Sequence, residues 1–133
     1  MTNIVVLEGR LSRPPARREL PSGDSLASLD LSVPAPPGGR ADSVPLVWFD
    51  PPAWVDRLEA GAELVVLGRV RRRFFRSGAG LASRTEVVVD AAAPPGRPAR
   101  VAAIMQRALT ALAPSDPEAA GVRPRGAVRP ASV

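Results

Sequence analysis

The sequence predicts an all-β domain of five short strands, with one short helix between the third and fourth strands. Three observations carry this prediction. Segments rich in β-branched and apolar residues recur along the chain, and proline, glycine, serine or aspartate bounds each of them. One segment with helical start and stop signals interrupts the series shortly after position 50. The length of 133 residues fits a single domain, and the 45% of apolar residues can supply its core.

The first three strands are expected at residues 3–11, 25–33 and 43–49. Pro14 and Pro15 keep the first strand from continuing, because proline lacks the N–H that a strand ladder needs. The second strand follows a Ser-Gly-Asp turn at 22–24 and alternates apolar with polar residues, as a half-buried strand does. A Pro/Gly loop at 34–42 separates it from the third strand.

A short helix is expected at 51–61. Asp50 can cap its start, two prolines fit its first turn, where no N–H partner is needed, and Gly61 can end it. A Gly-rich hairpin loop at 76–83 then joins the last two strands, which are expected at 62–76 and 84–92.

Pro94 and Pro95 predict that the β domain ends at about residue 93 and that a Pro/Ala/Arg-rich extension covers 94–133. A short amphipathic helix is expected at about 98–113. Its apolar face carries Val101, Ile104, Met105, Ala108, Leu109 and Leu112. Such a stripe fits core packing or an oligomer contact better than a binding groove. From Ser115 onward the composition is typical of a disordered tail.

The net charge of +5 predicts an anionic partner such as nucleic acid or a membrane surface. All 18 basic residues are arginine. A high-GC genome explains the absence of lysine, but it does not explain why the arginines cluster. No stretch approaches the ~20 apolar residues of a membrane helix, and the amino terminus does not resemble a signal peptide. A cytoplasmic, nucleoid-associated protein without membrane contact is therefore expected.

Catalysis has little support in the sequence. Without histidine or cysteine there is no disulfide, no imidazole chemistry and no zinc site built from those residues. The 13 carboxylates are scattered, and no Gly-rich loop precedes a lysine to hold ATP. We expect neither an enzyme nor a bound cofactor or metal.

The segment RVRRRFFR at 69–76 concentrates positive charge beside two of the three phenylalanines. Side chains alternate across a strand. One face is therefore expected to carry Arg69, Arg71, Arg73 and Phe75, and the other to enter the core with Leu64, Val66, Val70 and Phe74. A solvated edge strand would rarely keep an exposed phenylalanine among charges. Guanidiniums pair with phosphates and aromatic rings stack on bases, so the first face fits single-stranded nucleic acid.

Five strands with a helix between the third and fourth is the order of the OB-fold, a partly open barrel that commonly binds oligonucleotides. We therefore expect a five-stranded OB-fold barrel over 1–93, followed by the carboxyl-terminal helix and the tail. The fold alone does not fix the function.

Over about residues 3–91 the sequence resembles the bacterial single-stranded DNA-binding protein family. The resemblance is carried, in the family's order and spacing, by NIVVLEGRLSRPP, SGDSLASLDLSV, LVWFDPPAW, LEAGAELVVLGRVRRRFF and RTEVVVDA. It implies sequence-independent binding and protection of single-stranded DNA in replication, recombination or repair. It also implies a homo-oligomer, a tetramer or dimer, with the first strand as a candidate contact edge.

Matched residue by residue, Phe49 and Phe75 take the places of the family's stacking aromatics at the ends of the third and fourth strands. For Phe49, burial beneath the helix is the alternative. Trp48 is expected in the core and Trp54 in packing, with a role on a second surface as the alternative for Trp54. The full set of expected DNA-binding residues is Arg10, Phe49, Arg69, Arg71, Arg73, Phe75, Arg76 and Arg84.

The chain departs from the family pattern at several places. Val44 stands where the family often has tryptophan, and Asp50 replaces a glycine. The chain ends in the basic GVRPRGAVRPASV instead of an acidic tip, so recruitment of partners through such a tip is not expected. A divergent member is expected, and its pathway, its oligomer number, the role of its tail and its preference for DNA over RNA stay open. The alternative is an OB-fold protein-interaction or replication-accessory module that binds nucleic acid weakly.

Overall fold

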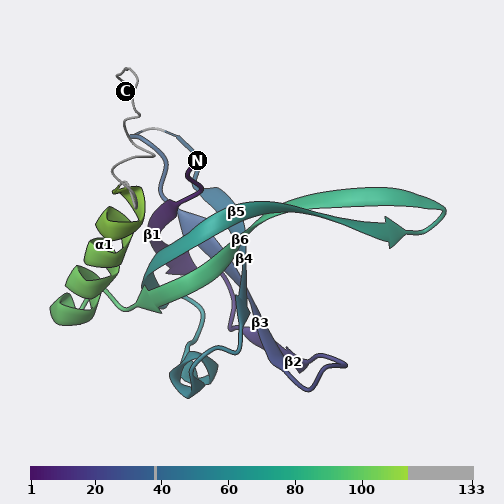
Figure 1. Ribbon diagram of the computed structural model, residues 1–133, viewed down its shortest axis with the longest axis horizontal. Helices are drawn as coiled ribbons and strands as arrows, with labels where there is room; N and C mark the ends of the chain where they lie inside the picture. Colours follow the sequence, from purple (N-terminus) through teal and green to yellow (C-terminus); the bar gives the residue numbers. More distant parts are fainter. Residues whose placement is uncertain (38, 114–133) are drawn as a thin grey trace.

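The computed structural model describes residues 1–37 and 39–113, which form six strands, one 3-10 helix and one α-helix (Figure 1). In chain order these are β1 (Val5–Leu11), β2 (Ala16–Glu19), β3 (Ser25–Val33), β4 (Asp42–Phe49), η1 (Ala53–Arg57), β5 (Glu63–Ser77), β6 (Gly80–Ala93) and α1 (Pro98–Leu112). The predicted disordered tail from Ser115 lies outside the described residues.

The strands close into a ring of hydrogen-bonded pairs. β1 pairs with both β5 and β3, β3 pairs with β4, β4 with β6, and β6 with β5. All of these pairs are antiparallel except β4–β6, which is parallel and short, joining Leu46 to Val87 and Val47 to Val88. Closure pairs strand edges that would otherwise be open to other chains. The predicted all-β class is confirmed.

The predicted number of strands is wrong, because β2 forms a sixth strand outside the ring. It pairs antiparallel with β3, to which the turn at 20–24 joins it, and Gly23 adopts a φ of 93° in that turn. Pro14 and Pro15 do end β1, as expected, but a new strand starts directly after them. All four residues of β2 are exposed. Apolar alternation therefore gave no signal for this strand.

The core fills the inside of the ring with alternate side chains from its strands. The fully buried members include Leu29 and Leu31 of β3, Leu64 and Val66 of β5, and Val55 of η1. The prediction that the tryptophans pack inward is confirmed. Trp48 is buried and meets the half-buried Trp54 edge to face, with ring centroids 5.8 Å apart.

The helix between β4 and β5 is shorter than predicted, and Asp50 does not cap it. Pro51 precedes a proline and is therefore disfavoured in the helical region, and Pro52 is itself extended with ψ 158°. η1 therefore starts only at Ala53 and has no side-chain cap. Asp50 instead takes a φ of 50°, and its Oδ1 accepts a hydrogen bond from the backbone N–H of Ser25 at 3.1 Å.

β5 and β6 are longer than the other strands and project beyond the ring as a two-stranded arm (Figure 1). We define the arm as residues 71–86. Pairing of β5 with β1 ends at Gly68, and β6 meets β4 only at Val87 and Val88, so the arm has no other strand beside it. The predicted hairpin loop at 76–83 is wrong, because pairing runs on to Ser77 and Gly80.

The arm explains why one core prediction fails. Leu64 and Val66 are buried as expected, but the same strand face leaves the barrel after Gly68. Val70 is 41% exposed and Phe74 is 67% exposed, so the prediction that these two side chains enter the core is wrong. Alternation places a side chain on a face, but the core must extend that far for the face to be buried.

The predicted helix at about 98–113 is present as α1 and packs on the outward face of β5 and β6. Ile104 and Ala108 are buried against Val65, Leu67 and Ala93 in a second apolar cluster. Val101 is half-buried against the same cluster, whereas Met105, Leu109 and Leu112 of the predicted stripe are exposed. The described part of the extension, residues 94–113, thus folds back onto the ring.

A β-bulge adjusts β6 beside Gly68. Leu67 pairs with Ala91 and Gly68 with Val89, which leaves Asp90 as the extra residue. The backbones approach closely here, and a Cβ on Gly68 would overlap the carbonyl oxygen of Val88.

Gly68→Ala is expected to lower the free energy of unfolding by about 1–3 kcal/mol, because the backbone atom in its way cannot move aside cheaply. Urea denaturation measures this change. Gly80→Ala is the matched control, since a Cβ there meets nothing within 4 Å. Equal stability of the two variants would show that the strands can separate at Gly68 without loss.

Candidate functional site

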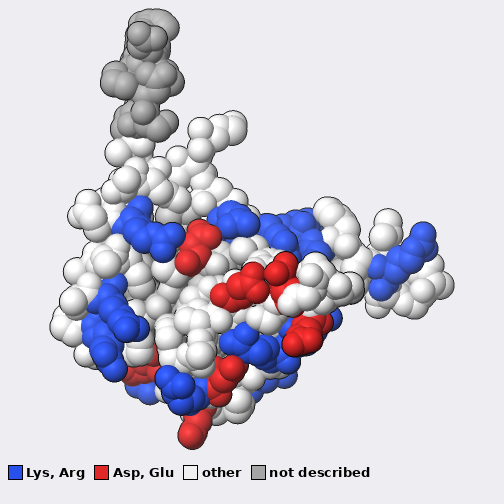
Figure 2. Space-filling view, turned by 60° about the horizontal axis from the view of Figure 1, so that its bottom comes forward, with Lys and Arg blue, Asp and Glu red and all other residues white. Residues whose placement is uncertain are grey.

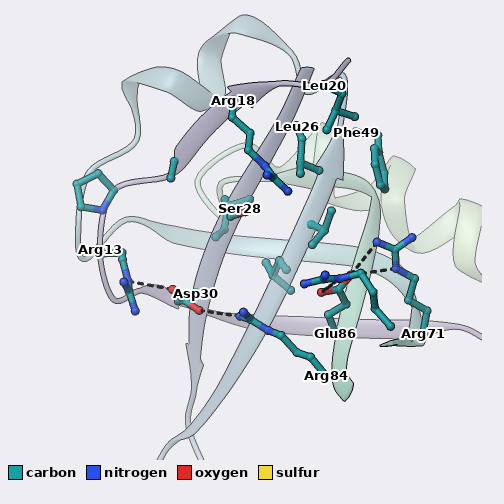
Figure 3. A pocket seen from close by; sticks show the side chains of 16 residues that line it. Arg13, Arg18, Leu20, Leu26, Ser28, Asp30, Phe49, Arg71, Arg84 and Glu86 are labelled. Atoms are coloured by element: carbon teal, nitrogen blue, oxygen red, sulfur yellow. Dashed lines mark hydrogen bonds and ion pairs between the residues drawn. The ribbon is translucent and has the colours of Figure 1, made fainter. Parts of the chain in front are cut away.

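A groove of about 410 Å³ crosses the outward face of β3, β4, β5 and β6, with β2 along one side (Figure 3). Alternation creates this face, because the neighbours of the core residues point outward: Ser28 and Asp30 from β3, and Val47 and Phe49 from β4. Five arginines line it against two carboxylates, a net charge of +3: Arg13, Arg18, Arg71, Arg73 and Arg84, with Asp30 and Glu86.

Glu86 is the centre of the charged side chains in the groove. It is 2% exposed, and the strand register places it directly opposite Arg71. Nη2 and Nε of Arg71 lie 2.8 and 2.9 Å from its Oε2, and Nε of Arg73 lies 3.5 Å from the same oxygen. A buried carboxylate is stable only with such partners. Figure 3 shows two guanidiniums converging on it from β5.

The same two guanidiniums lie over aromatic rings. The Cζ atom of Arg71 is 5.4 Å from the ring centroid of Phe49, and that of Arg73 is 4.9 Å from the ring centroid of Phe75. Phe49 is 40% exposed, so the alternative in which the helix buries it is wrong. Each pair is a cation–π contact.

Asp30 forms a second charged centre on the other side of the groove. Its Oδ2 lies 2.9 Å from Nε of Arg13, and its Oδ1 lies 4.0 Å from Nη2 of Arg84 (Figure 3). Arg13 and Arg84 come from opposite ends of the domain sequence, and the ring brings them to one carboxylate.

The structure gathers half of the predicted DNA-binding residues in the groove and disperses the others. Phe49, Arg71, Arg73 and Arg84 line it. Phe75 and Arg76 lie further out on the arm, and Arg69 lies next along β5, paired with Asp90 at 3.1 Å.

Arg10 lies apart from this set. It lines a different hollow, where it pairs with Glu63 at 2.6 Å. The first strand thus contributes none of the residues that line the groove.

Sequence reasoning missed four charged residues of the groove: Arg13, Arg18, Asp30 and Glu86. Arg13 directly precedes the two prolines, and Arg18 lies in β2, which carried no recognised pattern. Glu86 could have been found, because it lies two residues after Arg84 in a strand and therefore on the same face.

The expected open arginine stripe is largely paired with carboxylates. Figure 2 shows arginines and acids interspersed over the body of the molecule on the side in view, while the outer part of the arm shows arginine alone. In the described part of the chain, Arg72 and Arg76 of the arm have no carboxylate within 4.0 Å. Arg72 instead bonds the hydroxyl of Ser83 at 2.8 Å.

The groove can hold planar and anionic groups through ring faces and guanidinium donors. The described residues contain no group of three or more His, Cys, Asp or Glu side chains placed to hold a metal ion. None of the described helices is both long enough and apolar enough to span a bilayer.

No protein-family model matches the sequence, and no curated protein is significantly similar to it. The resemblance to single-stranded DNA-binding proteins therefore stays a prediction from the motifs of the chain.

Glu86→Gln is expected to lower the free energy of unfolding by about 1–3 kcal/mol. The amide offers a guanidinium an N–H₂ donor where a carboxylate oxygen stood, and the position is too buried for water to compensate. Thermal and urea denaturation measure the loss. Asp90→Asn, whose side chain is 39% exposed in its pair with Arg69, is the control and should change stability by less than about 1 kcal/mol. A loss no larger for Glu86→Gln than for this control would contradict the prediction.

Proposed function

We propose that the protein is an OB-fold protein that binds single-stranded DNA without sequence preference, in replication, recombination or repair. The observation that carries the proposal is the groove, in which the exposed ring of Phe49 and several guanidiniums lie on one sheet face, with the half-buried ring of Phe75 beyond it on the arm beneath Arg73. Rings stack on bases of any sequence, and guanidiniums contact the backbone.

The strand arrangement supports the OB-fold assignment. Without β2, the ring consists of five strands, and η1 lies between the third and fourth of them. The groove covers β3 and β4, the second and third strands of that ring, and the arm joins the fourth to the fifth. OB-folds bind oligonucleotides on this same face and with the loop between their fourth and fifth strands.

In this proposal two kinds of side chain bind DNA: phenylalanine rings contact the bases, and arginines contact phosphates and base edges. Phe49, at the end of β4, offers a ring face to a nucleotide base. Phe75, further along β5 in the arm, offers a second ring face. Arg71, Arg73 and Arg84 lie beside them and donate N–H groups to phosphate or base edges. RNA fits the same surface, and competition between matched DNA and RNA oligonucleotides distinguishes the two.

Assembly into a homo-oligomer is also a proposal. The edge of β1 that faces β3 is paired only at Arg10 and Leu11, so its stretch Val5–Glu8 has no described strand neighbour on that side. An unpaired strand edge can pair with a second copy. Light scattering coupled to size exclusion measures the number of copies.

A second candidate function is that of a protein-interaction or replication-accessory module with weak nucleic-acid binding. Its support is the exposed apolar stripe of α1, where Met105, Leu109 and Leu112 follow one another at helical spacing. This function predicts that Phe75→Ala leaves oligonucleotide affinity nearly unchanged.

Phe49→Ala and Phe75→Ala are each expected to weaken binding of a labelled oligo-dT by ~1–3 kcal/mol, because each removes one stacking ring. Fluorescence anisotropy at low and high salt measures this, and wild-type affinity should fall with a slope of about −0.7 per phosphate neutralised. Leu112→Ala is the control, since it also removes an exposed apolar side chain but lies on α1, outside the groove. Wild-type protein that fails to bind, or binds without salt dependence, would refute the proposal.

A further inference from the structure

Among the described residues Glu86 is the only polar or charged side chain that is fully buried, and it lies in the wall of the groove. Its presence is unexpected in a site for a polyanion. A carboxylate repels phosphate, and it competes with phosphate for Arg71 and Arg73. Two arginines without this acid would attract a DNA backbone more strongly.

The geometry at Glu86 shows what the carboxylate does to its partners. Two nitrogens of Arg71 bond one carboxylate oxygen, and the guanidinium at the same time lies over Phe49. Arg73 repeats the arrangement with Phe75, at a longer distance from Glu86. The acid therefore fixes two long and otherwise flexible side chains against the two rings of the site.

A guanidinium held in this way differs from a free cation in two respects. Its charge is partly neutralised, so it contributes less to the attraction of the backbone. Its flat surface stays over the ring, and arginine can stack on a base as well as on an aromatic side chain. The ring and the guanidinium together form one stack on which a base can continue.

We infer that Glu86 is a positioning residue that makes the groove select strands by their bases over other polyanions. This inference rests on the proposed single-stranded DNA binding. Glu86 lowers the share of binding that comes from phosphate contacts and raises the share that comes from stacking. The groove then adds little to the affinity for duplex backbones and other polyanions, while a strand with unpaired bases receives the full stacking contribution.

The test compares wild type and Glu86→Gln on two labelled oligonucleotides of equal length, one oligo-dT and one made of abasic sugar-phosphate units. Anisotropy is measured over a range of salt concentrations. The variant should bind the abasic strand more tightly than wild type does. Its slope of log affinity against log salt should steepen by up to about 1.4, because two arginines are released at ~0.7 each. The ratio of oligo-dT to abasic affinity should fall about fivefold to tenfold.

Asp90→Asn is the matched control, because it also releases one arginine from a carboxylate. Arg69 lies over no ring among the described contacts, so the slope should steepen by at most about 0.7 while the ratio of affinities stays the same. Arg71→Lys is a second variant, which keeps a cation beside Glu86 and protects the fold. Lysine stacks poorly, so this variant should lower the ratio without changing the slope.

The outcomes separate this inference from the proposed function. If Glu86→Gln changes both affinities by the same factor and leaves the slope unchanged, Glu86 only supports the structure and the inference is wrong. The proposed function then still stands, provided that Phe49→Ala weakens oligo-dT binding. If wild type binds neither strand, both the inference and the proposed function are wrong.

Discussion

The alternation of side chains along β5 governs most of this molecule. One face of the strand gives Leu64 and Val66 to the core, and the other gives Val65 and Leu67 to the contact with α1. Further along, that second face carries two arginines of the groove, Arg71 and Arg73. A single pleated strand therefore serves the barrel, the helix and the candidate site, and its register against β6 must be right for all three to form.

The candidate site depends on arginines that each contact a carboxylate and an aromatic ring at the same time. Glu86 holds Arg71 and Arg73 from one side, and Phe49 and Phe75 lie beneath or beside them. Lysine could supply the charge but not the planar donor set, so these positions use the property that separates arginine from lysine. The chain's lack of lysine fits a compositional bias, yet here the side chain is also the one that the geometry requires.

Much of the fold could be predicted from the sequence, because most of its elements have local causes. Apolar alternation predicted the strands of the ring, and helical periodicity predicted α1. The misses have other causes. β2 has no apolar face, the double proline delayed η1, and Phe74 lies on a face that the core no longer reaches.

The ion pairs of the site could not be predicted from composition, because they depend on pairing across the hairpin. Arg71 and Glu86 are far apart in the chain and meet only because the connection between β5 and β6 is as short as Gly78 and Ala79. The glycines of this segment favoured the prediction of a longer loop, at 76–83, and a longer loop does not reveal which residues of β5 and β6 pair. Recognition of the tight turn would have placed the acid opposite the arginine.

The arm has a consequence for how such a chain can vary. Because residues 71–86 pair with no strand outside the arm, its outer part can lengthen or shorten without disturbing the barrel. Side chains repeat every two residues, so adding an even number to each strand keeps Phe75 and Phe74 on their present faces. An odd insertion between Gly68 and Phe74 exchanges them. Homologous chains that differ in length between the barrel and these phenylalanines should therefore differ by even steps in each strand, a parity rule that would be visible in sequence alone.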